Sequence, residues 1–130
     1  MSNVETARSA YEAFGKGDLE ALKDGFAENA VWITSEELPL GGRTEGRDQI
    51  MGNFAQIPTY WSEFSVEPDE FIDAGDKVIV RGTEHVGNNN GHIDSRFVHV
   101  IEYEDGKLVR SEFFSDSAKE VKLLSEAAAS

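Results

Sequence analysis

The 130-residue sequence contains no cysteine, which excludes disulfide bridges, thiolate zinc sites and cysteine nucleophiles. Basic side chains are few: 12 lysines and arginines stand against 25 aspartates and glutamates, for a formal net charge of −13. An acidic surface repels phosphates, so we expect no nucleic-acid partner. Long apolar runs are also missing. The longest before the C-terminal residues is Ala30 to Ile33, far short of the about 20 residues of a membrane span, so we expect no membrane partner.

The residues that are present are typical of one globular domain. The length suits a single domain of about 100–150 residues, and 39% apolar with 28% charged residues is usual for soluble proteins. No basic segment followed by an apolar stretch opens the chain, so we expect no secretory signal and a cytoplasmic protein. We predict one domain over residues 1–124 and a frayed tail over residues 125–130.

The first 60 residues are predicted to be mainly helical. Ser2 and Glu5 have the spacing of a capping box, and apolar residues then recur at helical intervals. Asp18 can cap a second, shorter helix. In chain order, the elements expected after these two helices are a strand over residues 30–34, a loop over 35–45 and a third helix from about residue 47.

The second half changes to the alternating pattern of strands. The expected strands cover residues 61–72, 77–86, 93–103 and 107–115. Pro68 interrupts the first of them, so we expect an edge position or a bulge there. Helices that precede a run of hairpins indicate an α+β fold, with the helices covering one face of an antiparallel sheet.

The turn over residues 87–91 gives a register for the two central strands if its midpoint is Asn89. Arg81 then lies opposite Phe97, with His99 two residues further along the same face. A slip of one residue would exchange the faces, so both assignments depend on this register. The opposite face carries the four valines Val78, Val80, Val98 and Val100. We expect a second copy of the chain to cover that apolar patch.

The three histidines lie seven residues apart and raise the question of a metal site. In this register His85 and His99 are roughly 20 Å apart along the sheet, and His92 points to the opposite face. They cannot then converge on one ion, so we expect no metal. The Gly41-Gly42 pair is not followed by the lysine of a phosphate-binding loop, and we expect no cofactor.

Several segments, taken in order, resemble the SnoaL-like branch of the nuclear transport factor 2-like superfamily, which also contains ketosteroid isomerases. They are YEAFGKGDLEAL at 11–22, AVW at 30–32, GGRTEGRDQI at 41–50, FSVEPDEFIDAGDKVIVRG at 64–82 and FVHVIEYEDGKLVRSEFFSD at 97–116. The resemblance implies a cone-shaped, cystatin-like α+β fold in which three helices of the N-terminal half pack on a strongly curved antiparallel sheet. It also implies an apolar pocket, and homodimers formed through the outer sheet face.

The resemblance does not carry the known activities with it. The isomerases' general base falls at Thr34, which cannot take a proton from carbon at neutral pH, and their oxyanion aspartate falls at His99. Their oxyanion tyrosine falls at Ala10, next to Tyr11, and the cyclases' catalytic aspartate falls at Phe113. Neither steroid isomerisation nor SnoaL-type cyclisation can simply be transferred.

We expect a small-molecule pocket protein, and two alternatives stay open. One is a cofactor-independent acid–base enzyme of isomerase, cyclase or lyase type; the other is a non-catalytic ligand-binding or dimeric interaction module. In the first, His99 carries a proton, Arg81 stabilises negative charge and Glu37 acts as a base at the pocket entrance. The ligand would be a small apolar or cyclic organic molecule. Its expected contacts are Tyr11, Trp32, Thr34, Phe54, Trp61, Phe97, Ser111 and Phe113.

Overall fold

The computed structural model describes the backbone of residues 2–129 and the side chains of residues 2–125. The helices are α1 (Asn3–Gly15), α2 (Leu19–Asp24), α3 (Arg47–Ala55), α4 (Ile57–Tyr60) and α5 (Ser117–Ala129). The strands are β1 (Phe26–Thr34), β2 (Gly42–Glu45), β3 (Glu63–Ala74), β4 (Lys77–Asn88), β5 (Gly91–Glu104) and β6 (Lys107–Phe114). Across the described residues, no helix combines the length and apolar character needed to cross a membrane.

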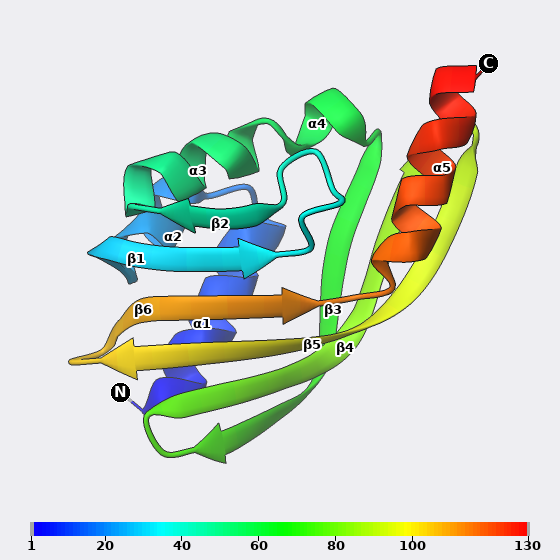
Figure 1. The fold of residues 1–130 in the computed structure, drawn as a ribbon. Coiled ribbons are helices and arrows are strands. Elements are labelled where there is room, and N and C mark those ends of the chain that lie inside the picture. The colour runs from blue at the N-terminus through cyan, green and yellow to red at the C-terminus, as the bar shows by residue number, and fades with distance from the viewer. Residues whose placement is uncertain (1, 130) are drawn as a thin grey trace.

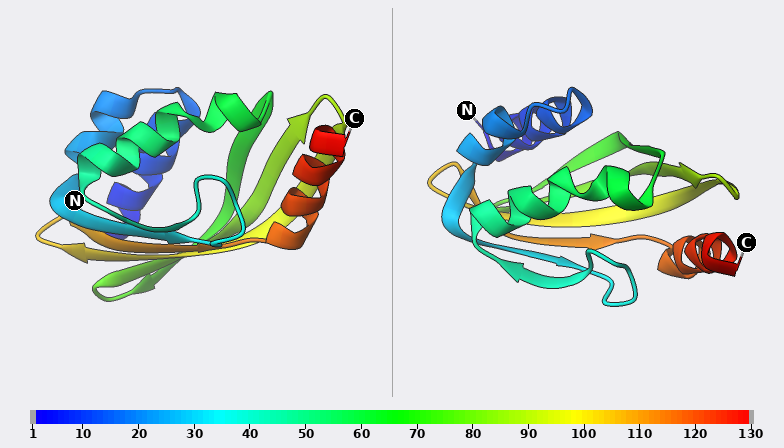
Figure 2. Two further views of the ribbon diagram at one scale, coloured as in Figure 1. Left: turned by 45° about the horizontal axis from the view of Figure 1, so that its top comes forward. Right: turned by 90° about the horizontal axis from the view of Figure 1, so that it is seen from above.

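All six strands form one sheet in the order β2-β1-β6-β5-β4-β3. Figure 1 shows the sheet curling around α1 to α4, while α5 stands at one end beside β4 and β5. The view from above in Figure 2 places the N-terminal helices and α5 at opposite ends of the molecule. The predicted α+β fold with a strongly curved sheet is confirmed. Two details of the sheet were not expected: β2 forms inside the predicted loop, and β1 pairs with β6 in parallel.

Local sequence signals explain where the first helices begin. The backbone N–H of Glu5 donates to Ser2 Oγ at 3.1 Å, and that of Ala21 donates to Asp18 Oδ1 at 3.1 Å. Each contact satisfies one of the N–H groups that have no partner inside the helix. Both predicted caps are confirmed.

Turn and breaker residues explain the ends of the strands. Asp105 and Gly106 both have positive φ, at 50° and 77°, as a two-residue turn between twisted antiparallel strands requires. Pro68 lies on β3, an edge strand of the sheet, and the pairing register with β4 shifts between Pro68 and Glu70. The structure therefore confirms both the edge position and the bulge predicted at Pro68.

The register of β4 against β5 differs from the prediction by one residue. Asn88 pairs with Gly91, so the turn holds two residues between them rather than one at its midpoint. Arg81 consequently lies opposite Val98 and Val80 opposite His99. Because side chains alternate between faces, this single step turns every side chain of β4 to the other face relative to β5.

The predicted valine patch is wrong for this reason. Val78 and Val80 are both fully buried beneath the helices, whereas Val98 is 38% exposed on the outer face of the sheet. The prediction that His85 and His92 point to opposite faces is wrong as well, since the two rings stack with centroids 6.3 Å apart.

The core consists of two clusters. The larger lies between the helices α1 to α3 and the concave face of the sheet, and includes Phe26, Ile50, Phe97 and Ile101. A smaller one brings Leu123 of α5 onto strand residues. No helix was predicted at this end. The boundary at residue 124 and the frayed tail after it stay predictions, although the backbone is helical as far as Ala129.

Candidate functional site

A cavity of about 170 Å³ lies between the concave face of the sheet and the helices. Its lining is mostly apolar and rich in aromatic side chains. An apolar cavity of about 150 Å³ is enough to bind benzene. The β1–β2 loop contributes Leu38 and the exposed Pro39, so the cavity opens to solvent at this end. In Figure 1 that loop lies at the same end of the molecule as α4 and α5.

Most of the residues expected to contact the ligand do meet at this cavity. Those that line it are Tyr11, Trp32, Thr34, Phe54, Trp61 and Phe113. Phe97 lies behind them and stacks on Phe113 with ring centroids 4.9 Å apart. Ser111 does not line the cavity either, but it forms a hydrogen bond with His99, which does.

His99 is held in place by protein partners on both sides of its ring. Its Nδ1 lies 2.7 Å from the Tyr11 hydroxyl and its Nε2 lies 2.5 Å from Ser111 Oγ. Burial disfavours the charged imidazolium and lowers the pKa of His99 to about 3. The ring is therefore neutral at physiological pH, and it fixes the position of the Tyr11 hydroxyl in the cavity.

Two residues that were predicted to act at the site lie elsewhere. Arg81 is exposed on the outer face of the sheet, where its Nη1 lies 2.8 Å from Glu70 Oε1. It is on the opposite face from His99 because of the one-residue change in register. Glu37 is exposed in the β1–β2 loop and is not among the residues that line the cavity. Neither side chain therefore belongs to the site predicted around His99.

Sequence reasoning missed a pair of buried carboxyl groups. Glu84 on β4 and Glu120 on α5 are each 2% exposed, and both line the cavity. Burial, and then the hydrogen bond and charge of Glu120, raise the pKa of Glu84 to about 9. A second carboxyl group beside it in an apolar site disfavours the charged form of Glu84, so Glu84 keeps its proton at neutral pH. Ser115 Oγ donates to Glu120 Oε2 at 3.3 Å.

Two buried polar atoms remain without a hydrogen-bond partner among the side chains that the structure describes. They are Glu84 Oε1 and the hydroxyl of Tyr103, and both residues line the cavity. Native proteins rarely leave such atoms unpaired, because each costs about 1–3 kcal/mol. Both atoms are therefore suited to a polar group of a bound molecule.

The sequence profile of the SnoaL-like domain matches residues 7–111. Among solved structures, an NTF2-like protein of unknown function from Burkholderia pseudomallei is 34% identical, with a TM-score of 0.88, over 95% of this chain and 98% of that one. TerC, co-crystallised with polyporic acid, is 31% identical, with a TM-score of 0.87, over 95% and 98%. A putative SnoaL-like polyketide cyclase from Jannaschia is 16% identical, with a TM-score of 0.81 over 95% and 91%, and shares the fold. No curated protein matches the chain.

Proposed function

The chain belongs to the SnoaL-like family, and on that premise we propose that it is a cofactor-independent acid–base enzyme acting on a small, apolar, cyclic organic molecule. The observation that carries the proposal is the carboxyl pair of Glu84 and Glu120 in the lining of an apolar cavity. An acid that keeps its proton at neutral pH, beside a base, is the equipment that proton-transfer catalysis needs.

The shape and chemistry of the cavity support the ligand class. Many aromatic rings line the cavity, and flat apolar molecules gain most from such a surface. TerC, which is 31% identical to this chain, was crystallised with polyporic acid. This likeness supports an organic molecule as the ligand. Polar groups in the lining, among them Tyr11, Tyr103 and Glu84, would orient it.

The proposed chemistry assigns a separate role to each polar group. Glu84 donates its proton to an oxygen or carbon of the substrate, while Glu120 takes a proton from a neighbouring position. The proton then returns from Glu120 to Glu84 through the hydrogen bond between the two carboxyl groups, which restores the starting state for the next turnover. The Tyr11 hydroxyl, held by His99, and the Tyr103 hydroxyl stabilise negative charge that develops on the substrate. His99 then acts as a positioning residue and not as the proton carrier.

Binding and turnover are tested separately. Polyporic acid serves as the binding probe, and the fluorescence of Trp32 and Trp61 reports it, because both indoles line the cavity. Turnover is measured as deuterium uptake from D₂O into a panel of enolisable cyclic ketones, followed by NMR. Glu84→Gln keeps the shape of the side chain and its ability to form hydrogen bonds but removes its acid, so we expect little change in probe binding and a loss of about 100-fold or more in exchange.

Glu102→Gln is the matched control: Glu102 is partly exposed and does not line the cavity, so its replacement should change neither measurement. Probe binding without exchange of any ketone in the wild-type protein would favour the alternative, a non-catalytic ligand-binding module. Absence of both would contradict the assignment of the cavity as a ligand site.

We also propose that the chain forms homodimers through the outer sheet face. The centre of this interface differs from the four valines predicted from the sequence. Cross-strand neighbours there form an apolar patch of Ile72, Ile79, Val98, Val100 and Phe114. The ion pairs Arg81–Glu70 and Arg96–Asp69 lie on the same strands, so the surface offers both charges to a second copy related by two-fold symmetry. Sedimentation at micromolar concentration should show a dimer that Val98→Glu converts to a monomer; a monomeric wild type would contradict this.

A further inference from the structure

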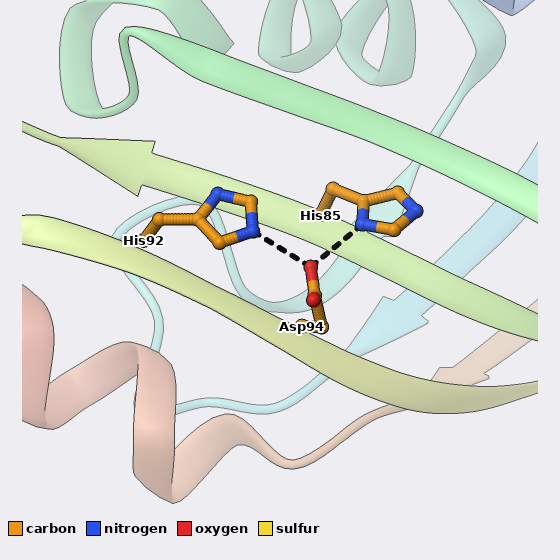
Figure 3. A group of neighbouring side chains, drawn as sticks. All are labelled: His85, His92 and Asp94. Carbon is orange, nitrogen blue, oxygen red and sulfur yellow. Dashed lines mark hydrogen bonds and ion pairs between the residues drawn. The ribbon is translucent and has the colours of Figure 1, made fainter.

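The outer face of the sheet carries a group of potential metal ligands that is independent of the cavity. His85 on β4 meets His92 and Asp94 on β5 near the end of the hairpin (Figure 3). His85 Nδ1 and His92 Nε2 each lie 2.7 Å from the same atom, Asp94 Oδ1. The two histidine nitrogens and the aspartate oxygen all lie within 4.8 Å of one another.

The strand register explains why these side chains converge. His92 and Asp94 are two residues apart on β5, so they share a face. Asp94 lies directly opposite His85, and His92 lies opposite Gly87, which has no side chain to separate the two rings. The same one-residue change that places Arg81 outside the cavity therefore assembles this cluster.

Two further carboxylates form hydrogen bonds with the two imidazoles. His85 Nε2 lies 3.0 Å from Glu67 Oε2, and His92 Nδ1 forms a hydrogen bond with Glu63 Oε1. Each ring thus has one nitrogen held by a glutamate of β3 and the other directed at Asp94. In metal sites the imidazole nitrogen that does not bind the ion usually donates its N–H to a carboxylate in this way.

We propose that His85, His92 and Asp94 bind one zinc-type divalent ion, with Glu67 and Glu63 as the outer acceptors and water in the remaining position. Zinc takes two imidazoles and a carboxylate at about 2.0–2.2 Å, which separates neighbouring ligand atoms of a tetrahedron by about 3.3 Å. The two N···O distances of 2.7 Å would lengthen to about this value when an ion enters between the ligand atoms. Imidazole ligands favour zinc over magnesium and calcium, and the net charge of −13 attracts cations generally.

The site does not depend on the proposed function, because these side chains lie on the outer face and none of them lines the cavity. A bound ion would tie β4 to β5 at their hairpin end. Any ligand that binds only the folded state raises its stability. Zinc should therefore raise the unfolding temperature of the wild-type chain.

The first test is calorimetric titration of Zn²⁺ into the chain without a histidine tag. We expect saturable binding of one equivalent. His85→Gln, His92→Gln and Asp94→Asn should each weaken it by at least tenfold, and Glu67→Gln by about tenfold through the loss of the outer acceptor. Glu102→Gln removes a carboxylate from the same face of β5 without touching the cluster, and it should leave the affinity unchanged.

The variants also separate this site from general attraction of cations to an acidic surface. Equal weakening by Glu102→Gln and Asp94→Asn, or no weakening by either histidine variant, would overturn the proposal, as would the absence of saturable Zn²⁺ binding. The unfolding temperature of each variant without zinc is its own baseline, because the hydrogen bonds among these side chains also contribute to stability. The rise in that temperature with Zn²⁺ should vanish in the histidine variants and persist in Glu102→Gln.

Discussion

Glu84 and His85 are neighbours in the sequence, yet they lie on opposite faces of β4 and hold protons for opposite reasons. Glu84 faces the cavity, where burial penalises its charged form and raises its pKa to about 9. His85 faces outward, where hydrogen bonds to Asp94 and then Glu67 raise the pKa of its imidazole by favouring the charged form. One residue step along a strand therefore separates a carboxyl group held in its neutral form from an imidazole whose charged form is favoured.

The histidines repeat the comparison on β5. His99 on the inner face is neutral because burial lowers its pKa to about 3. His92 on the outer face has a raised pKa because Asp94 and Glu63 accept from its ring. The chemistry of each imidazole follows from the face that the register assigns to it, so substitutions that distinguish the faces are the sharpest tests.

The largest effect is expected where the inner face is most crowded. A Cβ on Gly82 would lie 2.3 Å from the carbonyl oxygen of Glu67 and 2.8 Å from the Phe97 ring. Gly82→Ala should lower the free energy of unfolding by about 3 kcal/mol, the upper range for overpacking, because one of the contacts is backbone. Urea denaturation measures it.

The matched control is Gly52, which is exposed within α3 and where an added Cβ would meet no other atom within 4 Å. Gly52→Ala should raise stability by about 0.5–1 kcal/mol, because alanine favours the helix. Equal effects of the two substitutions would contradict the inner placement of Gly82.

A pair of valines compares the faces directly. Val80 is fully buried and Val98 is 38% exposed. Val80→Ala should cost about 2 kcal/mol of unfolding free energy, from lost burial and the cavity left behind. Val98→Ala should cost less than about 0.5 kcal/mol when the protein is compared at concentrations too low for association. Similar costs for the two substitutions would instead support the register with Asn89 at the midpoint, which places both valines on one face.

The proton on Glu84 makes stability depend on pH. The folded chain keeps this proton up to about pH 9, whereas the unfolded chain releases it near the ordinary value of 4.5. Between these values the folded state binds more protons, so the free energy of unfolding falls as pH rises. Denaturation at pH 7 and pH 8.5, above the range in which His99 of the unfolded chain takes up a proton, should show a loss of at least about 1.4 kcal/mol, the equivalent of one pKa unit.

Glu84→Gln isolates this contribution, because glutamine cannot ionise. The outer histidines also lose their stabilising charge as pH rises, since their pKa values are raised by carboxylates, and their part of the slope remains in the variant. A slope identical in wild type and Glu84→Gln would show that the carboxyl is not held neutral.

The smallest effect is expected for Arg81. Its ion pair with Glu70 is half-exposed, and such pairs contribute about 0–1 kcal/mol. Arg81→Leu should change stability by less than about 0.5 kcal/mol and leave the affinity for polyporic acid unchanged in fluorescence titration. A marked loss of affinity would return Arg81 to the ligand site.

The sequence was sufficient for those features that local chemistry decides. Ser2 and Asp18 cap helices because their side chains reach the free N–H groups, and Pro68 marks an edge because it cannot donate to a neighbouring strand. The inner face of β5 was also predicted correctly, with Phe97 and His99 inside. These signals need no knowledge of distant contacts.

The turn over residues 87–91 was different, because its glycines and asparagines accept several turn positions equally well. A choice between them shifts β4 by one residue, which hid the inward direction of Glu84 and brought Arg81 into the predicted cluster. The alternation of Val78, Val80 and Val86 was the signal that could have corrected it, since all three are fully buried. The role of Glu120 was harder still to predict, because the helix that carries it was not expected.

The parallel pairing of β1 with β6 has a consequence for the order of folding. Trp32 pairs with Ser111, 79 positions further along the chain, whereas β3 to β6 are joined by short hairpins. Pairings of such long separation carry a high entropic cost and form slowly. The hairpins can assemble first, and docking of β1 closes the side of the cavity that carries Trp32. Recovery of probe binding during refolding should thus lag behind the formation of strands, which makes the cavity a kinetic marker of the last native contact.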